Sequence, residues 1–177
     1  TAINGNYYYF LTDGSLKTGL FSVKGSKNTY WYYAGSNAQL FVNRTLSMGG
    51  KIYCFGPNGR TLAKGLQTLN GKKYLIGSDG IARTGRQKYK GKVYFFGSDG
   101  AMLTGKVTYN GQLYFTNKNG TLRKKGWVTS GGKTYYVNSD GTLQTGWKKY
   151  KKKWYYLNKK TGVKAVNKWV TKNGKKC

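Results

Sequence analysis

A repeat of about 20 residues that ends on glycine runs through this 177-residue chain. Gly65, Gly85 and Gly105 are 20 residues apart, and Gly126 and Gly146 follow at intervals of 21 and 20 residues. The frame continues in both directions with looser spacing, which gives about seven full units and a partial unit at each end. One such unit cannot bury an apolar face alone, whereas stacked copies can. We therefore predict a single repeat array over residues 1–177, which we expect to be a piece of a longer protein.

Two series of tight turns alternate along the repeat. The first contains Asn70-Gly71 and Asn110-Gly111, and such pairs tolerate the two positive φ angles of a type I′ hairpin turn. The second contains Asp-Gly or Asn-Gly pairs, and short runs rich in Tyr, Phe and Val lie between the two series, as strands require. No window has an apolar stripe at helical spacing. The expected fold is all-β, an elongated β-solenoid of stacked β-hairpin repeats with about 20 residues per unit.

The few carboxylates of the chain all stand in turns. There are four, Asp13, Asp79, Asp99 and Asp140, each directly followed by glycine, and the sequence contains no Glu and no His. A general acid–base pair cannot be assembled from such a set. We therefore expect a protein that is not an enzyme and that uses no cofactor and no metal.

The cysteines and the hydropathy add little. Cys54 stands where most units have Tyr or Phe, so we expect it to be a small buried hydrophobe. Cys177 is far from it along the array, which disfavours an internal disulfide and leaves intermolecular pairing open. No apolar run approaches the roughly 20 residues that span a membrane.

The pattern Gly-Trp-x7-Tyr-Tyr-x3-Asp-Gly-x3-Thr-Gly over residues 126–146 resembles the cell-wall-binding repeats of Gram-positive bacterial surface proteins. That superfamily includes the choline-binding repeats and the glucan-binding repeats of glucansucrases. The resemblance implies a β-hairpin solenoid, a non-catalytic role, and secretion to the bacterial cell surface or cell wall as part of a longer surface protein.

The resemblance also suggests one aromatic site. Choline-binding repeats build their site from Trp residues of neighbouring units, and only Trp147, Trp154 and Trp169, with Tyr155 or Tyr156, supply such a set here. A cation–π site of this kind is worth about 0.5–2 kcal/mol for a quaternary ammonium ligand. The neighbouring lysines oppose a cationic ligand, so choline is disfavoured for most of the array.

The charge points to a polyanion. The chain has 32 Lys and Arg residues against 4 Asp and Glu, a net charge of +28, and its C-terminal part is the most basic. Self-repulsion of this size destabilises a compact state unless counter-charge is present. In a Gram-positive surface protein, teichoic and lipoteichoic acids would supply that charge. The candidate basic residues for polymer binding are Lys148, Lys149, Lys151, Lys152, Lys153, Lys159 and Lys160.

The aromatic side chains offer a second mode of binding, since Tyr and Trp faces stack on sugar rings. The candidates are Trp127, Tyr136, Trp147, Trp154, Tyr155, Tyr156 and Trp169. The alternative is that these rings only build or cap the hydrophobic stack.

These patterns favour a non-catalytic module that attaches its parent protein to an anionic cell-wall polymer, with aromatic stacking on sugars. A neutral, dextran-like α-glucan is the alternative ligand. Basic residues interleaved with aromatics also describe single-strand nucleic-acid platforms, but the sequence has no nucleic-acid-binding motif.

Overall fold

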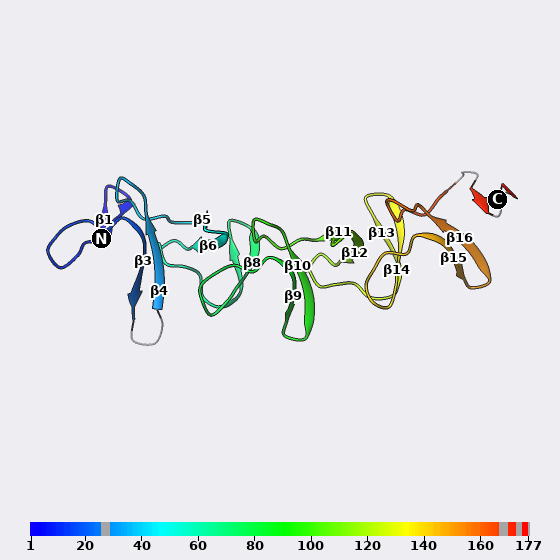
Figure 1. The fold of residues 1–177 in the computed structure, drawn as a ribbon, viewed down its shortest axis with the longest axis horizontal. Helices are drawn as coiled ribbons and strands as arrows, with labels where there is room; N and C mark the ends of the chain where they lie inside the picture. Colours follow the sequence, from blue (N-terminus) through cyan, green and yellow to red (C-terminus); the bar gives the residue numbers. More distant parts are fainter. Residues whose placement is uncertain (26–28, 167–169, 173–174, 177) are drawn as a thin grey trace. The chain divides into compact units, whose positions relative to one another are not determined.

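The computed structural model describes residues 1–25, 29–166, 170–172 and 175–176. Every regular element in these ranges is a short strand, and consecutive strands pair as antiparallel two-stranded hairpins (Figure 1). The predicted all-β repeat of hairpins about 20 residues apart is confirmed. The strands are β1 Ala2–Ile3, β2 Asn6–Tyr7, β3 Gly19–Lys24, β4 Thr29–Ala34, β5 Arg44–Met48, β6 Lys51–Phe55, β7 Gly65–Leu69, β8 Lys72–Ile76, β9 Gly85–Tyr89, β10 Lys92–Phe96, β11 Gly105–Tyr109, β12 Gln112–Thr116, β13 Gly126–Ser130, β14 Lys133–Val137, β15 Gly146–Tyr150, β16 Lys153–Leu157, β17 Thr171–Lys172 and β18 Lys175–Lys176. In the part of the chain so described, no helix is long and apolar enough to cross a membrane.

The hairpin tips use the predicted left-handed turns. In the β11–β12 hairpin, Asn110 has a φ of 48° and Gly111 a φ of 73°, and Tyr109 pairs with Gln112 on either side of them. Two consecutive positive φ angles match the twist of the flanking strands, which is why Asn-Gly is favoured there. The tip residues therefore fix the register of each hairpin.

The Asp-Gly pairs make the turn of the linker that follows each hairpin. The Asp140 carboxylate accepts hydrogen bonds from the backbone N–H of Thr142 at 2.9 Å and from its hydroxyl at 2.7 Å. Asn119 accepts the same two bonds from Thr121 at 3.1 and 2.7 Å. An acceptor at this place closes an Asx turn whether or not it is charged. The carboxylates thus have a structural role.

Each linker is held at two points. The N–H of Ala82 donates to the carbonyl of Ile52, in the preceding hairpin, and the N–H of Arg83 donates to Leu75 of its own hairpin, both at 2.8 Å. The same two backbone hydrogen bonds, from N–H to carbonyl, recur in the other linkers. The donors and acceptors are Thr61 to Trp31 with Leu62 to Cys54, Met102 to Lys73 with Leu103 to Phe95, Leu122 to Val93 with Arg123 to Phe115, Leu143 to Leu113 with Gln144 to Tyr136, and Lys164 to Thr134 with Ala165 to Tyr156. Because two-stranded hairpins are marginal alone, these bonds and the cores beneath them make the repeat stable.

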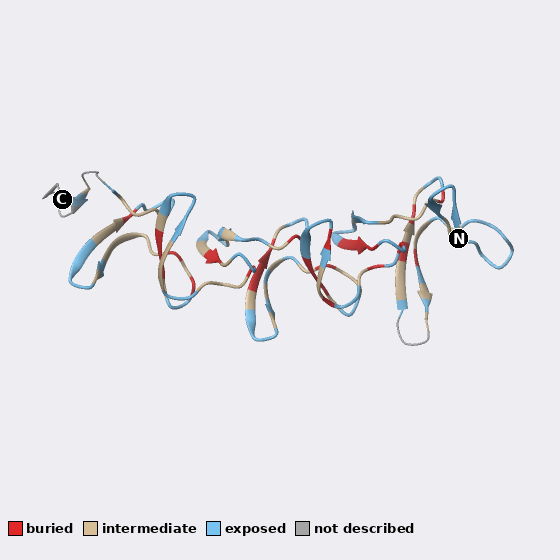
Figure 2. Cartoon of the chain, turned by 180° about the vertical axis from the view of Figure 1, so that it is seen from behind, coloured by how far each residue is buried: buried red, intermediate tan, exposed pale blue. Residues whose placement is uncertain are grey.

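The contacts divide the chain into two compact units. One consists of residues 1–85 and 96–102, and the other of residues 86–95 and 103–177. Buried residues gather on the second strand of the hairpins and on the linkers (Figure 2).

Two apolar clusters lie in the first unit. Phe21, Tyr32 and Ala34 form one of them. The other consists of Ile52, Cys54, Leu69, Tyr74, Ile76, Ala82 and Ala101. Cys54 is 0% exposed, and burial raises the pKa of its thiol to about 12. The expectation of a small buried hydrophobe at this position is therefore confirmed, while Cys177 lies outside the described residues.

One apolar cluster lies in the second unit. Phe115, Tyr135, Val137 and Leu143 are buried together. Leu113, Val128 and Val163 pack around them. Burial of a side chain such as Phe or Leu contributes about 1.5–3 kcal/mol, and this cluster joins strands β12, β13 and β14 to the linkers that carry Leu143 and Val163.

Candidate functional site

The β15–β16 hairpin separates its side chains by face. Its register pairs Trp147 with Tyr156 and Lys149 with Trp154, whereas Lys148 pairs with Tyr155. Directly opposed residues share a face and successive residues alternate. One face therefore carries Trp147, Lys149, Trp154 and Tyr156, and the other carries Lys148, Tyr150, Lys153 and Tyr155.

The first face has an aromatic group that reaches solvent. The ring centroids of Trp147 and Trp154 are 6.5 Å apart, with the planes at 85°. Trp147 and Tyr156 are 5.2 Å apart at 64°. Trp154 is 52% exposed, so about half of this residue faces solvent. Trp169, predicted to join this group, lies outside the described residues.

The second face packs into a cluster of four rings, Trp127, Tyr136, Tyr150 and Tyr155. Trp127 is central, with its centroid 5.1 Å from Tyr136, 5.9 Å from Tyr150 and 5.0 Å from Tyr155. Tyr136 and Tyr150 are 5.7 Å apart. Tyr136 is only 2% exposed, so its ring contributes packing rather than an open stacking face. Trp127 and Tyr155 are half-buried.

Lysine ammonium groups lie against this four-ring cluster. The Nζ atom of Lys148 is 4.5 Å from the centroid of Tyr136. The Nζ atom of Lys164 is 6.0 Å from the centroid of Trp127 and 5.9 Å from that of Tyr155. Cation–π attraction acts within about 6 Å of a ring centroid. The cluster is therefore already in contact with cations of the protein itself.

The other predicted lysines are at the surface. Lys149, Lys151, Lys152 and Lys153 are exposed around the hairpin tip, and Lys159 and Lys160 are exposed in the following linker. Among the residues that the structure describes, ion pairs are found only for Lys72 with Asp99 and for Arg83 with Asp79. The lysine-rich tip thus has positive charge that forms no ion pair with a carboxylate of the described residues.

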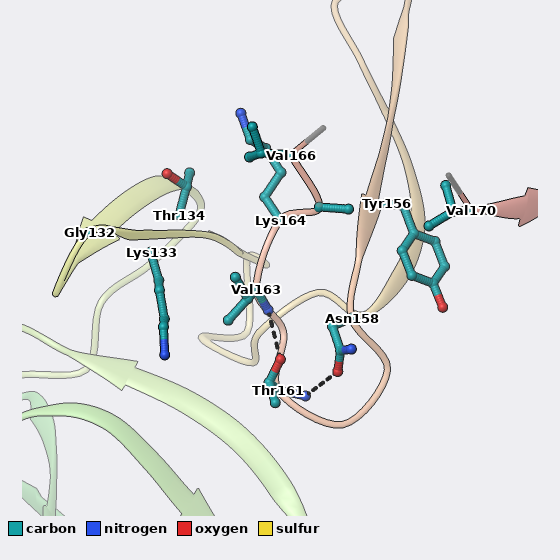
Figure 3. Close-up of a pocket in the computed structure, with 11 residues that line it drawn as sticks. Gly132, Lys133, Thr134, Tyr156, Asn158, Thr161, Val163, Lys164, Val166 and Val170 are labelled. Carbon is teal, nitrogen blue, oxygen red and sulfur yellow. Dashed lines mark hydrogen bonds between the residues drawn. The ribbon is translucent and has the colours of Figure 1, made fainter. Parts of the chain in front are cut away.

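Two hollows adjoin these residues. A cleft of about 440 Å³ is lined by Tyr156, three valines and the lysines Lys133 and Lys164 (Figure 3). The valines are Val163, Val166 and Val170. A polar groove of about 600 Å³ is lined by Lys159 and Lys160, by the Asp140 carboxylate, and by hydroxyl and amide side chains, among them Thr108 and Gln112. The cleft offers an apolar wall for a sugar face, and the groove offers hydrogen-bonding groups and charges of both signs.

Three of the four Asp side chains have a lowered pKa because of hydrogen bonds within their turns. Hydrogen bonds from the side chain and backbone of Thr142 lower the pKa of Asp140, and those from Ser15 lower the pKa of Asp13. Burial alone would raise the pKa of Asp79, but hydrogen bonds from Ile81 and Arg83 bring it below its ordinary value. A general acid near neutral pH needs the opposite shift. Within the described ranges no cluster of His, Cys, Asp or Glu could hold a metal ion.

Three residues of this region were not predicted from the sequence. Tyr150 completes the four-ring cluster, Lys164 lies over two of its rings, and Lys133 lines the cleft. Only Lys164 left a clear signal. Lys164 forms an isolated antiparallel bridge with Leu157, the last residue of β16. In the other repeats the linker residue that forms the equivalent bridge is Leu16, Leu40, Thr61, Ala82, Met102, Leu122 or Leu143.

The chain matches known repeats over much of its length. A family described as a choline-binding repeat matches residues 83–122 and 124–169, and one described as a cell wall binding repeat matches residues 2–16.

Two curated relatives are glucosyltransferases. Glucosyltransferase-S of Streptococcus mutans is 31% identical over 86 residues, which cover 48% of this chain and 6% of the relative. Glucosyltransferase-I of Streptococcus downei is 33% identical over 81 residues, which cover 45% of this chain and 5% of the relative. The chain therefore spans only a small part of the length of these relatives.

Among solved structures, choline binding protein F from Streptococcus pneumoniae, in the presence of a peptidoglycan analogue, has a TM-score of 0.54 and 26% identity. The match covers 98% of this chain and 81% of that one.

Proposed function

Because the chain belongs to the superfamily of cell-wall-binding repeats, which includes choline-binding and glucan-binding repeats, we propose that it is a non-catalytic binding module. It attaches its parent protein to a polymer of the bacterial cell wall or the extracellular matrix, on the outside of the cell. The polymer that the site favours most is anionic, of the teichoic or lipoteichoic acid type.

One observation carries this choice of polymer. The tip of the β15–β16 hairpin has four exposed lysines, Lys149, Lys151, Lys152 and Lys153, beside the exposed ring of Trp154. No described carboxylate forms an ion pair with any of them. Lysine binds phosphate as a compact point charge, which suits a flexible polymer without a fixed geometry. The exposed part of the Trp154 indole can stack on the sugars of the same polymer.

The test removes four positive charges from each of two hairpins. The first variant is Lys149→Gln, Lys151→Asn, Lys152→Gly and Lys153→Gln. The control variant removes the four exposed charges of the β9–β10 hairpin, as Arg86→Gln, Lys88→Gln, Lys90→Asn and Lys92→Gln. We expect the first variant to lose most of its binding to purified cell walls and the control to lose much less. Circular dichroism of both variants verifies that the hairpins still form.

Salt and stripped walls complete the test. Exposed charges act over about 8–10 Å at ordinary salt and much less at 1 M. We therefore expect binding to fall steeply as salt rises, and to fall when teichoic acid is removed from the walls. Binding that is unchanged from low salt to 1 M would contradict an electrostatic mechanism.

A neutral α-glucan is the second candidate, because the two curated relatives are glucosyltransferases. The cleft beside Tyr156, with its valine wall, is the part of the structure that favours it. Retention on dextran resin at 1 M salt, with no effect of the lysine substitutions, would place this function first.

A further inference from the structure

The backbone of Lys164 forms the same hydrogen bond as that of a buried leucine one repeat earlier, but its side chain is charged. Its N–H donates to the carbonyl of Thr134 at 2.7 Å, as the N–H of Leu143 donates to Leu113 at 2.7 Å one repeat earlier. Leu143 is buried in the core of the second unit. A lysine held at the same place cannot turn freely toward solvent, so its stem follows the apolar surface while the charged end seeks a polar or aromatic partner.

The Lys164 ammonium lies at the corner between the Trp127 and Tyr155 rings. Trp127 and Tyr155 meet edge to face, with centroids 5.0 Å apart and planes at 65°. The Lys164 ammonium is almost equidistant from both, at 6.0 and 5.9 Å. Lys164 is itself half-buried, and the linker that carries it runs between Thr134 and Tyr156 (Figure 3).

Aromatic corners of this kind are what quaternary ammonium ligands recognise. We propose that Lys164 is a tethered cation that occupies the Trp127–Tyr155 corner and keeps free quaternary ammonium ligands out of it. Lys164 is then a specificity determinant. The Trp127–Tyr155 corner has the rings of a cation-binding site, but the Lys164 ammonium takes the place of a free ligand. Lys148, whose ammonium lies 4.5 Å from the Tyr136 centroid, strengthens the exclusion by adding a second positive charge to the same four-ring cluster.

The exclusion has two physical parts. A tethered group competes at an effective concentration of the order of millimolar or above, so a weak free ligand rarely displaces it. A second ammonium in the corner would also face a like charge at short range, and this repulsion is stronger in a half-buried site than in water. Neither part depends on which polymer the lysine-rich tip binds, so this inference stands or falls separately from the proposed function.

The test is to remove the ammonium and keep the fold. Lys164→Leu introduces the residue that stands at position 143, and Lys118→Leu removes an exposed linker lysine as a control for charge. Choline chloride and tetramethylammonium chloride are titrated into each protein, with tryptophan fluorescence and calorimetry as readouts. We expect Lys164→Leu to bind both cations at least tenfold more tightly than the wild type, and Lys118→Leu to match the wild type.

Two further variants make the result specific. Trp127→Phe added to Lys164→Leu should weaken the new binding while keeping an aromatic core. Lys148→Val added to Lys164→Leu should strengthen it, since Val128 occupies the equivalent place one repeat earlier. If Lys164→Leu perturbs folding, Lys164→Gln, which keeps the length of the stem, is titrated in its place. Equal affinity of the wild type and the position-164 variants, or an equal gain in Lys118→Leu, would overturn the proposal.

Discussion

Lys151 and Lys152 are adjacent at the tip of the β15–β16 hairpin, and both have a left-handed backbone, with φ of 46° and 64°. The equivalent turn of β11–β12 is formed by Asn110 and Gly111. A residue with a full side chain costs about 1–3 kcal/mol in this conformation, whereas Gly costs almost nothing and Asn costs little. Two strained lysines at the exposed tip of a basic hairpin indicate that charge is retained there at the expense of stability.

The first prediction follows from this strain. Lys151→Asn with Lys152→Gly should raise the free energy of unfolding by about 1–2 kcal/mol, because the turn then has residues that favour positive φ. Polymer binding should fall at the same time, since two exposed charges are removed. Urea unfolding and cell-wall binding measure the two effects.

The reciprocal change is the control. Asn110→Lys with Gly111→Lys should destabilise the β11–β12 hairpin by a similar amount. Equal stability of all three proteins would mean that the turn conformation carries no strain and that the lysines need no functional reason.

Turn chemistry explains which parts of the fold could be predicted. Asn70-Gly71 and Asn110-Gly111 mark hairpin tips because few other residue pairs accept two positive φ angles. Lys151-Lys152 forms the same turn without either marker, so composition alone does not reveal it.

The site was less predictable for a different reason. The candidate lysines and tryptophans were recognised by type, but Trp127 meets Tyr150 and Tyr155 only because hairpins one repeat apart stack. The place of Lys164 over those rings depends in addition on the linker bond from Lys164 to Thr134. Neither contact has a short-range sequence signal, so both required the structure.

Arg123 supports a second prediction. Arg83 forms two hydrogen bonds with the Asp79 carboxylate, at 3.0 and 3.1 Å. In the linker that contains Arg123, Asn119 stands in the place of that Asp, and Arg123 instead donates to the carbonyl of Trp127 at 3.3 Å. Its Nε atom is buried without a hydrogen-bond partner in the described structure.

Asn119→Asp should therefore stabilise the protein by about 0.3–1 kcal/mol, the usual value of a partly exposed ion pair. The gain, measured by urea unfolding at low salt, should shrink at 1 M salt because screening weakens the pair. In an Arg123→Leu background, which copies Leu103 of the preceding repeat, the same substitution should give no gain. If Asn119→Asp still stabilises the protein in the Arg123→Leu background, the gain comes from the turn and not from an ion pair with Arg123.

The third prediction concerns acid. The folded state lowers the pKa values of Asp13, Asp79 and Asp140 below their ordinary value of 3.8. A group with a lowered pKa contributes stability that is present above its unfolded pKa and is lost as the pH falls through its folded pKa. Stability should thus be constant between pH 7 and 5 and should decline below about pH 4.

A variant with Asn at these three positions should decline less between pH 4 and 2. At pH 7 it should lose only the Asp79–Arg83 ion pair, about 0.3–1 kcal/mol. The turns themselves should remain, because Asn119 already closes the same turn through hydrogen bonds to Thr121. Urea unfolding as a function of pH measures both effects. If the triple variant loses as much stability between pH 4 and 2 as the wild type, the loss comes from general charge repulsion and not from these carboxylates.

The last prediction separates a binding role of Trp154 from a capping role. Trp154 is 52% exposed, whereas Trp127 is half-buried and contacts three rings. Trp154→Ala should lower stability by about 1 kcal/mol at most, because it removes one edge-to-face ring contact, with Trp147. Trp127→Ala should cost about 2 kcal/mol or more, because it opens a cavity and removes aromatic contacts.

Trp154→Ala should also weaken polymer binding about tenfold, because it removes a stacking face worth roughly 1–2 kcal/mol. Thermal unfolding and cell-wall binding of both variants decide the matter. If Trp154→Ala lowers the stability and leaves binding intact, its ring caps the apolar stack of the hairpin and does not contact the polymer.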